Sequence, residues 1–418
     1  MARVIIVSER PSCDRTNAMD EIRNKNLIKQ LDAAENDREF LVFGQPQILE
    51  DEIEEVVACL RSGWIGTGPR VARFEQDFAA FKGVERAVAV GSCSAAIHLS
   101  VGICIEPGDE VITSALTFCS TVNSIIHAGG RPVLADIDPG TMNLDSRDVE
   151  ARITSRTRAL VPVHFGGRPC DMDALLALAG RHGLRVIEDC AHAIEAEYHG
   201  VGTGRIGDFG CFSFYATKNL TTGEGGMVLA RRPQDLDRIR TLALHGLSTD
   251  AWSRFQDTGQ KHSYAIQVGY KYNMTDLQAA IGIHQLRRIE RNRRRRTEIW
   301  SRYQDAFQDL PADLPAAPGP DTRHAAHLYT LLIDESRAGI GRDDFLDAMK
   351  RLAIGVGVHY LSIAEHPIYR ELFGWEPETW PEAYRVGRRT VSLPLSPKLT
   401  DADVERVIRA VRKTLRSD

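Results

Sequence analysis

The chain has 418 residues, of which 43% are hydrophobic and 26% are charged, and its formal net charge is -5. This composition is typical of a globular protein, and the length predicts two domains instead of a single core. The small negative charge gives no sign of a nucleic-acid surface, and no apolar stretch reaches the length of a transmembrane helix.

The segment 1–42 is expected to be an N-terminal extension, either partly disordered or serving as an arm. It opens with the apolar run 4–7 and then turns polar and charged. That run is too short for the apolar part of a secretory signal, and no small-residue cleavage site follows it. The eight cysteines of the chain include no C-x-x-C pair, which is typical of thiols kept reduced, so a cytoplasmic location is expected.

From about residue 84 onward, short apolar runs alternate with amphipathic stretches. The apolar runs predict strands at 87–90, 110–113, 133–137, 159–163, 185–188, 211–214 and 227–230. The amphipathic stretches predict helices at 94–103, 119–128, 148–153 and 172–182. This alternation predicts an α/β fold in which right-handed crossovers build a mainly parallel seven-stranded sheet. Ligands of such sheets bind beyond the carboxyl ends of the strands.

The first predicted strand leads into a turn rich in glycine and serine, 91–96, and then into a helix. Such a turn presents free backbone N–H groups, hydroxyl groups and the positive end of the helix dipole to an anion, and phosphate is the natural guest. A serine can equally cap a helix that binds nothing. The turn therefore predicts a phosphate site only in combination with other residues.

Aromatic and imidazole side chains follow the next strands. Phe118 and His164 each come just after a predicted strand, and His192 lies three residues beyond Asp189. Phe118 could stack on a flat ring or simply fill the core. His192 could face the ligand pocket, but a buried histidine satisfied by the backbone is an equal alternative.

Asp189 and Lys218 form the most informative pair of the chain. Lys218 lies between the aromatic strand at 211–214 and the glycine-rich run 223–226, where a purely solubilising charge is out of place. A desolvated lysine loses its proton more easily and can form a Schiff base with an aldehyde cofactor. An aspartate at a strand end can keep a pyridine nitrogen protonated. With the phosphate turn, this pair predicts an enzyme of pyridoxal 5′-phosphate (PLP), and an aminotransferase is the favoured reaction class.

Two motifs of other enzyme classes are set aside. The run 202–207 fits the dinucleotide pattern G-x-G-x-x-G, but it leads into a strand instead of opening a helix, so it is interpreted as a loop. The triplet Asp208-Phe209-Gly210 is not accompanied by a kinase glycine-rich loop or catalytic loop. Histidines and carboxylates show no helical metal-ligand spacing, and no metal is expected.

The second half of the chain predicts a long helix at 275–307, a proline-rich break at 310–320 and then a smaller α+β unit. The arginine run 293–296 is interpreted as a solvated or ion-paired helix face. The smaller unit is expected to contain strands at 328–333 and 355–359 and helices at 342–352 and 401–415. The predicted division is a large PLP-binding domain at 43–275 and a linking helix with a smaller C-terminal domain at 276–418.

Together these motifs resemble the DegT/DnrJ/StrS family of PLP-dependent sugar aminotransferases over roughly residues 43–415. The resembling segments are 63–69 (GWIGTGP), 91–96 (GSCSAA), 116–118 (LTF), 163–167 (VHFGG), 188–193 (EDCAHA), 213–220 (SFYATKNL), 269–276 (GYKYNMTD) and 392–395 (SLPL). The resemblance implies the fold-type I aminotransferase architecture and a homodimer whose active site is completed by the neighbouring subunit.

The resemblance also implies roles for individual residues. Lys218 would form the Schiff base with PLP, and Asp189 would pair with the pyridine nitrogen. His192 would lie near the ring oxygen, and Phe118 would stack on the ring.

Further residues would hold the phosphate and the substrate. The backbone of Cys93 and the side chains of Ser94 and Ser213 would hold the phosphate, together with Asn273 from the neighbouring subunit. Two positions are expected near the substrate, Thr67 and His327.

The function implied by the resemblance is transfer of an amino group from glutamate to a nucleotide-linked keto sugar, with an NDP-4-keto-6-deoxyhexose as the favoured acceptor. Some sugar dehydratases of the family have histidine in place of the catalytic lysine, so Lys218 favours transamination. Two alternatives stay open: a keto-cyclitol as acceptor, and a non-catalytic PLP-binding regulator. The expected partners are the sugar nucleotide and glutamate, with neither a nucleic acid nor a membrane.

Overall fold

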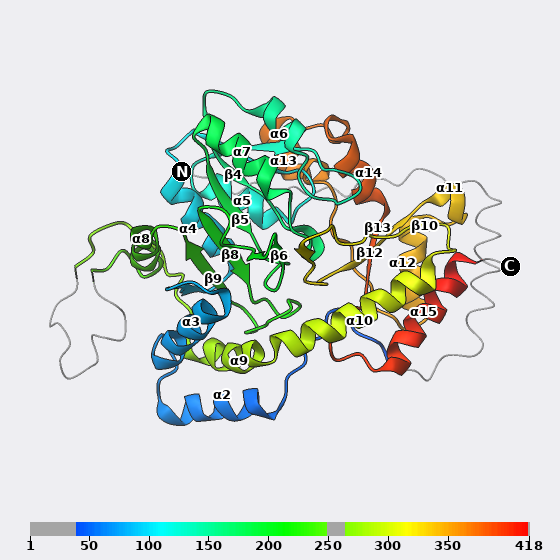
Figure 1. The fold of residues 1–418 in the computed structure, drawn as a ribbon, viewed down its shortest axis with the longest axis horizontal. Coiled ribbons are helices and arrows are strands. Elements are labelled where there is room, and N and C mark those ends of the chain that lie inside the picture. Colours follow the sequence, from blue (N-terminus) through cyan, green and yellow to red (C-terminus); the bar gives the residue numbers. More distant parts are fainter. Residues whose placement is uncertain (1–38, 249–263, 417–418) are drawn as a thin grey trace.

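The computed structural model describes residues 39–248 and 264–416, and a seven-stranded sheet lies at the centre of its larger part (Figure 1). The strands of this sheet are β1 (Val88–Val90), β2 (Glu110–Ser114), β3 (Arg131–Ala135), β4 (Thr157–Val161), β5 (Arg185–Asp189), β8 (Phe209–Ser213) and β9 (Gly226–Ala230). Their order is β1-β9-β8-β5-β4-β2-β3. Only β9 runs against the other strands of this sheet, because it pairs antiparallel with both β1 and β8. The predicted α/β fold with a mainly parallel sheet is confirmed.

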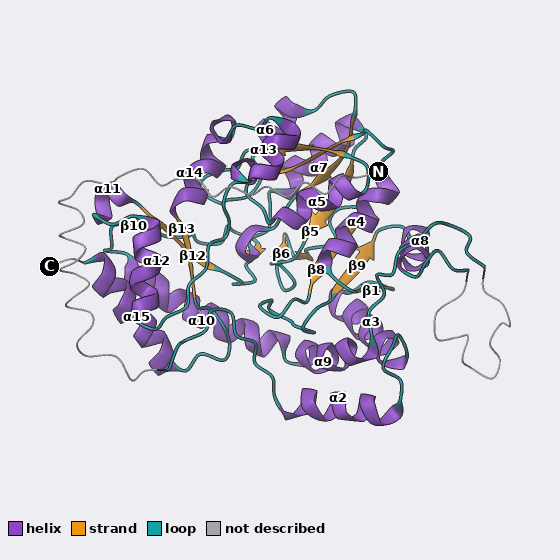
Figure 2. Cartoon of the chain, turned by 180° about the vertical axis from the view of Figure 1, so that it is seen from behind, coloured by secondary structure: helices purple, strands orange, loops and turns teal. Residues whose placement is uncertain are grey.

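Helices cover both faces of this sheet (Figure 2). Because successive side chains of a strand point to opposite faces, Cys211 of β8 packs with α4, whereas Phe212 packs with α3 and α9. The helices of the first face are α4 (Cys93–Cys104), α5 (Cys119–His127) and α8 (Pro233–Ala243). Those of the second face are α3 (Pro69–Lys82), α6 (Ser146–Arg152), α7 (Met172–His182) and α9 (Asp276–Arg287). Outside them, α2 (Glu50–Ser62) packs against α9.

Local sequence signals explain where several helices begin and end. The Asp171 side chain caps α7 by accepting a hydrogen bond from the Ala174 N–H, and Gly183 ends the helix in the left-handed conformation. Thr275 and Gln278 form a capping box at the start of α9. These signals lie in the sequence itself, and α7 has the bounds that the sequence predicts.

A smaller unit follows the long helix α10 (Ile289–Phe307), which runs from α9 toward the C-terminal elements (Figure 1). The elements of the unit are β10 (Ala312–Asp313), β12 (Tyr329–Ile333), α11 (Glu335–Ala338), α12 (Arg342–Arg351), α13 (Pro367–Phe373), α14 (Pro381–Arg389), β13 (Thr390–Leu393) and α15 (Asp401–Leu415). The sheet of the unit has the order β10-β12-β13, and its core combines Tyr303 and Phe307 of α10 with Phe345 of α12 and Val407 of α15.

A third, small sheet connects the two parts. It has the order β11-β6-β7, and its strands are β6 (Glu197–Tyr198), β7 (Val201–Gly202) and β11 (Thr322–Arg323). The strand β6 follows β5 of the large sheet, whereas β11 precedes β12 of the smaller unit. The segment that leads into the smaller unit is thereby held next to the large sheet.

Two predicted elements of the second half are wrong. The helix predicted at 275–307 is two helices, because Arg288 leaves the helical conformation (φ -107°, ψ 9°) and its buried side chain pairs with Glu52. The strand predicted at 355–359 does not form. Its backbone meets two different partners, Leu41 at Ile354 and Ser392 at Gly357, so no continuous ladder develops.

Two predicted strands are displaced along the chain. The strands predicted at 133–137 and 159–163 are β3 and β4, and both begin and end two residues earlier. Their polar first residues, Arg131 and Thr157, pair in register with Glu110 of β2. An apolar run marks the buried part of a strand, whereas the hydrogen-bonded ladder extends beyond it.

The arginine run at 293–296 is an ion-paired surface only in part. Arg293 pairs with Glu290, and Arg295 pairs with Glu298. Arg296 is instead buried, with 1% of its surface exposed.

Part of the N-terminal prediction lies outside the described residues, because the extension was placed at 1–42 and the described chain begins at residue 39. Within that overlap, Leu41 pairs with Ile354 of the smaller unit. The division into domains at 43–275 and 276–418 stays a prediction. None of the helices in residues 39–248 and 264–416 combines the length and hydropathy that crossing a membrane requires.

Candidate active site

Five loops meet at one edge of the large sheet, because β1, β2, β4, β5 and β8 run in the same direction. The carboxyl ends of these strands lead to the turn at 91–94, to Phe118, to His164, to Asp189 and to Lys218. Ligand sites of α/β sheets lie at this edge. The sheet therefore positions the predicted residues around one region.

The two serines of the turn after β1 have different roles. Ser92 caps α4, and its hydroxyl accepts a hydrogen bond from the Ala95 N–H at 3.1 Å. Ser94 lies in the first helical turn with its side chain exposed. Within the described chain, the N–H groups of Cys93 and Ser94 have no hydrogen-bond partner. The turn thus offers unpaired donors at the positive end of a helix, which is an anion site.

A glycine on the neighbouring strand makes room for this turn. An added Cβ at Gly226 of β9 would lie 2.6 Å from the Ser92 carbonyl oxygen. Any larger residue there would push the turn out of place. Close approach of the backbone to the turn therefore depends on this glycine.

The Asp189 carboxylate is held firmly from two sides. Its side chain is buried, and it accepts hydrogen bonds from the Thr121 hydroxyl at 3.0 Å and from the Ala191 N–H at 3.0 Å. Burial raises the pKa of Asp189, while these hydrogen bonds and the charge of Lys218 lower it. The carboxylate is therefore oriented before any ligand binds. Thr121 was not predicted, because a threonine inside a helix gives no signal by itself.

The Lys218 amine is available for chemistry. Its backbone N–H donates to the Tyr215 carbonyl at 2.9 Å, which fixes the loop. Throughout the described residues, no hydrogen bond or ion pair engages the amine itself. Burial lowers the pKa of Lys218 to about 8, and the charge of Asp189 opposes this effect. A large share of the amine is therefore neutral near that pH, as a nucleophile requires.

Both ring nitrogens of His192 are occupied by protein groups. The Gly166 N–H donates to Nδ1 at 3.2 Å, so Nε2 carries the proton and donates to the Tyr360 hydroxyl at 2.9 Å. Burial lowers the pKa of His192 well below its ordinary value, and the charge of Lys218 lowers it further. The ring is therefore neutral, and the Tyr360 proton remains free for donation into the pocket.

Phe118 and Ser213 border the same region. Phe118 is 55% exposed although it is aromatic, and its ring centroid lies 5.7 Å from that of Tyr360. An exposed aromatic ring in this position can cover a flat ligand. Ser213 ends β8, and its hydroxyl accepts a weak hydrogen bond from the Tyr215 N–H at 3.4 Å.

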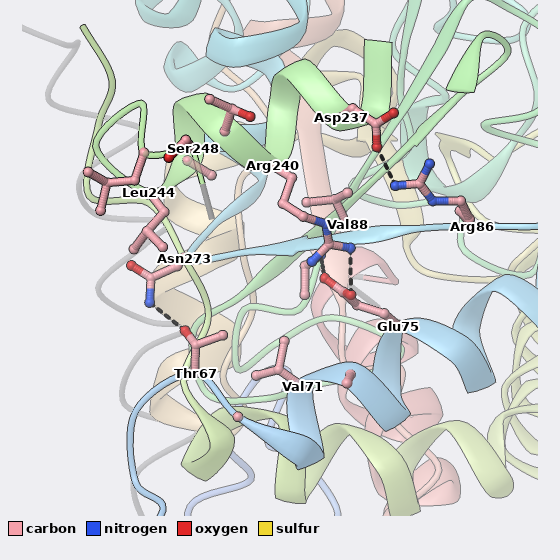
Figure 3. Close-up of a pocket in the computed structure, with 16 residues that line it drawn as sticks. Thr67, Val71, Glu75, Arg86, Val88, Asp237, Arg240, Leu244, Ser248 and Asn273 are labelled. Carbon is pink, nitrogen blue, oxygen red and sulfur yellow. Dashed lines mark hydrogen bonds and ion pairs between the residues drawn. The ribbon is translucent and has the colours of Figure 1, made fainter. Parts of the chain in front are cut away.

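Thr67 and Asn273 form a separate pair in a cavity of about 430 Å³ (Figure 3). The Asn273 amide donates to the Thr67 hydroxyl at 2.5 Å, and that hydroxyl donates to the Met274 carbonyl at 2.5 Å. The Asn273 Oδ1 atom is buried and has no partner in the part of the chain that the structure describes. Neither side chain is linked by a hydrogen bond to Lys218 or Asp189. The Asn273 backbone nevertheless bridges to Val90, at the start of the turn at 91–94.

The glycine-rich run at 202–207 is a loop, as predicted, and the structure shows its use. The N–H groups of Gly204, Ile206 and Gly207 donate to the buried Glu188 carboxylate at 2.7–2.8 Å. Glu188 also pairs with His164 at 2.9 Å. The pattern that elsewhere holds a dinucleotide here holds a carboxylate of the protein itself.

The groups at the sheet edge fit PLP. They comprise an amine with a lowered pKa, an oriented carboxylate, an anion site with unpaired donors and an exposed aromatic ring. Tyr360 and Thr121 belong to the same site but were not predicted. Tyr360 directly follows the segment 355–359, where a strand was predicted and a loop exists.

Comparison with known proteins agrees with this site. The sequence model of the DegT/DnrJ/EryC1/StrS aminotransferase family matches residues 46–412. The chain therefore belongs to this family of aminotransferases, as the resemblance predicted.

Individual relatives are similar over nearly the whole chain. The spore coat polysaccharide biosynthesis protein SpsC of Bacillus subtilis is 50% identical over 375 residues, which cover 89% of this chain and 96% of SpsC. The putative sugar aminotransferase Spr1654 from Streptococcus pneumoniae, in its PMP form, has a TM-score of 0.84 and 31% identity, covering 90% of this chain and 98% of Spr1654. Helicobacter pylori PseC, an aminotransferase involved in the biosynthesis of pseudoaminic acid, has a TM-score of 0.83 and 26% identity, covering 91% of this chain and all (100%) of PseC.

These comparisons confirm the enzyme class and the cofactor. Spr1654 has been solved in a PLP form as well as in a PMP form. The chain is a PLP-dependent aminotransferase of fold type I, and its relatives act on sugars.

Proposed function

We propose that this member of the family transfers an amino group from glutamate to a nucleotide-linked keto sugar, with an NDP-4-keto-6-deoxyhexose as the favoured acceptor. The observation that carries the proposal is the Lys218 amine. It has no hydrogen-bond or ion-pair partner in the described chain, and the charge of Asp189 is close enough to raise its pKa. When bound, PLP supplies an aldehyde carbon for a Schiff base and a pyridinium ring that draws electrons from the reacting carbon.

The residues of the sheet edge would hold the cofactor. The N–H of Cys93 and the hydroxyls of Ser94 and Ser213 would hold its phosphate, and Asp189 would pair with its ring nitrogen. Phe118 would cover the ring face. His192 would lie near the ring oxygen of the cofactor, and His327 would lie near the substrate.

Lys218 would move the proton in both halves of the reaction. Because its pKa is lowered to about 8, Nζ can accept a proton from the α-carbon of glutamate and later return one to the carbonyl carbon of the sugar. Asp189 would act through the ring nitrogen of the cofactor. The hydrogen bonds from Thr121 and from the Ala191 N–H hold its carboxylate in one orientation for that contact.

The choice of a 4-keto sugar rests on resemblance. The segment 269–273 (GYKYN) resembles the aminotransferases that act at C4 more closely than those that act at C3. A keto-cyclitol is the second candidate acceptor. A regulator without turnover is disfavoured, because a non-catalytic relative has no need of both Lys218 and Asp189.

A panel of acceptors tests the proposal. The PLP-loaded protein is incubated with ¹⁵N-glutamate and, separately, with an NDP-4-keto-6-deoxyhexose, an NDP-3-keto-6-deoxyhexose and a keto-cyclitol, and the products are identified by mass spectrometry and NMR. We expect ¹⁵N at C4 of the first sugar. Transfer to the cyclitol alone would contradict the sugar assignment, and no transfer to any acceptor would favour the regulator.

We further propose that the active unit is a homodimer in which Asn273 serves the phosphate of the neighbouring subunit. Its Oδ1 atom is buried without a partner in residues 39–248 and 264–416. Large apolar side chains beside it are exposed: Val268 to 95%, Ile266 to 60% and Ile65 to 52%. Exposed apolar side chains of this extent are typical of a surface that a second protein covers.

Mixed dimers test the contribution from the neighbouring subunit. Lys218→Ala and Asn273→Ala chains are each nearly inactive alone, but a hybrid dimer has one site with both residues intact if Asn273 acts across the interface. Refolding the two variants together should therefore restore activity. If Asn273 acts within its own chain, every site of the hybrid lacks one residue and no activity returns.

A further inference from the structure

Asn219, the residue after Lys218, has an amide group with a forced orientation. Its Nδ2 donates to the Glu195 carboxylate at 2.8 Å and to the Ala325 carbonyl at 3.1 Å. Both partners can only accept, so the amide cannot be flipped. Its Oδ1 must therefore face the third neighbour, His327, at 2.9 Å.

This orientation decides the tautomer of His327. Because Asn219 Oδ1 can only accept, His327 Nδ1 must carry the proton. The ring is buried, and burial together with the charge of Lys218 lowers the pKa of His327 well below its ordinary value. In the neutral ring, Nε2 is then a bare acceptor, and it has no hydrogen-bond partner in the chain as described.

A buried ion pair holds the Glu195 carboxylate in place. Arg296 of α10 and Glu195 are each 1% exposed and are joined by a short contact between Nη2 and Oε1. The guanidinium can only donate, so it occupies one carboxylate oxygen of Glu195, and the other oxygen accepts from Asn219. The pair also joins the helix that links the two parts of the molecule to the loop of Lys218.

His192 has the opposite tautomer. Its ring centroid lies 4.5 Å from that of His327, and its proton is on Nε2 because the Gly166 N–H occupies Nδ1. The two neighbouring neutral rings, tilted by 35° to each other, thus present different groups. His192 donates to Tyr360, whereas His327 offers a lone pair.

We propose that Asn219 and the Glu195–Arg296 pair are positioning residues that fix the tautomer of His327, so that its Nε2 accepts a hydrogen bond from a hydroxyl group of the keto sugar. The proposal rests on the function proposed above. A sugar is rich in hydroxyl donors. The carboxylates of glutamate are acceptors, which the lone pair of Nε2 repels.

The tautomer can be measured without cofactor or substrate. Apoprotein with ¹⁵N-labelled histidine rings is compared in long-range ¹H–¹⁵N spectra, and His327→Gln identifies the His327 signals among the 13 histidines. In the unmodified protein, we expect a protonated Nδ1 and a bare Nε2. In Asn219→Leu, the proton is no longer confined to Nδ1, so the two nitrogen signals should move toward each other.

A second asparagine provides the matched control. Asn292 is buried and, like Asn219, lines a cavity of about 20 Å³ beside Lys218 and Arg296, but it makes no side-chain hydrogen bond to His327. Asn292→Leu should leave the His327 signals in place. If Asn219→Leu does not fold, Asn219→Ala removes the same acceptor with less bulk. A folded Asn219 variant with unchanged His327 signals overturns the proposal.

The two half-reactions test the hydroxyl assignment. In Asn219→Leu, kcat/KM for the keto sugar should fall about 10- to 100-fold, a typical effect of removing the hydrogen-bond partner that orients a binding histidine. The half-reaction with glutamate should be unchanged. An equal loss in both halves would overturn the assignment to a sugar hydroxyl. If the unmodified protein turns over no keto sugar, the proposed function fails, while the NMR result still decides the tautomer.

Discussion

The pocket at the sheet edge has two sides that differ in how their polar groups are satisfied. On one side, Asp189 and His192 are hydrogen-bonded to protein groups at each functional atom. On the other side, the Lys218 amine and the N–H of Ser94 have no hydrogen-bond partner in the described chain, and Phe118 is 55% exposed. We call the first the held side and the second the open side.

The difference separates orientation from reactivity. A carboxylate or imidazole that acts through its orientation is fixed before the ligand arrives. A group that binds the cofactor directly keeps its bonding capacity for the cofactor. Substitutions on the open side should therefore lower activity without changing the free energy of unfolding. Substitutions on the held side, or at Glu188 next to it in the chain, should lower the free energy of unfolding.

The largest expected effect is on the open side. Lys218→Ala removes the nucleophile and the proton carrier together, so turnover should be lost, at least by the 10²- to 10⁴-fold that a general acid–base supplies. Because no hydrogen bond or ion pair engages the amine within the described chain, the midpoint of thermal unfolding of the apoprotein should be unchanged.

The control for this variant is Lys218→Arg, which keeps a positive charge but cannot form the Schiff base. It should be as inactive as the alanine variant. Full activity in either variant would refute the role of Lys218.

Glu188, which precedes Asp189 of the held side, tests whether such a substitution lowers stability. Glu188→Leu leaves three N–H groups, two of them on buried residues, and His164 without their acceptor, so the free energy of unfolding should fall by about 3–5 kcal/mol. Denaturant unfolding of the apoprotein measures it. A loss below about 1 kcal/mol, the range of an exposed pair, would contradict this account.

Much of the site could be predicted because it follows strands. Asp189 and Lys218 each come after an apolar run, and parallel strands bring such residues to one edge. The glycine and serine composition of the turn at 91–96 gave an independent signal of an anion site.

The remainder depends on contacts between distant segments. Tyr360 lies in a loop directly after the segment 355–359, where a strand was predicted but the backbone meets two separate partners. Thr121 and Asn219 are ordinary polar residues until folding places Asp189 and His327 beside them. The break at Arg288 arises from its pairing with Glu52, which no local pattern reveals.

The pH dependence of cofactor capture sharpens the comparison further. The neutral amine is the reactive form, and the pKa of Lys218 is lowered to about 8 from an ordinary 10.5. The rate of PLP binding by the apoprotein should rise about tenfold per pH unit below 8 and level off above it. Stopped-flow absorbance measures the rate.

Asp189→Asn tests the direction in which Asp189 shifts the pKa of Lys218. The carboxylate raises the pKa of Lys218, so its removal should move the midpoint to lower pH. A midpoint near 10.5 in the unmodified protein would show an exposed, unperturbed amine.

The smallest expected effects compare two serines of one turn. Ser94→Ala should weaken PLP binding by about 1.5–3 kcal/mol, the range for a hydrogen bond to a charged group, and leave stability unchanged. Ser92→Ala removes a helix cap and should lower the free energy of unfolding by about 0.5–2 kcal/mol. Titration with PLP and denaturant unfolding of both variants measure the two effects. Interchanged results would reverse the roles of the two serines.

The most direct test of the central assignment is reductive trapping. The protein is loaded with PLP, reduced with borohydride and digested, and the labelled peptide is identified by mass spectrometry. We expect a pyridoxyl group on Lys218 and no label in Lys218→Arg. A label on another lysine of the unmodified protein, or none at all, would contradict the assignment.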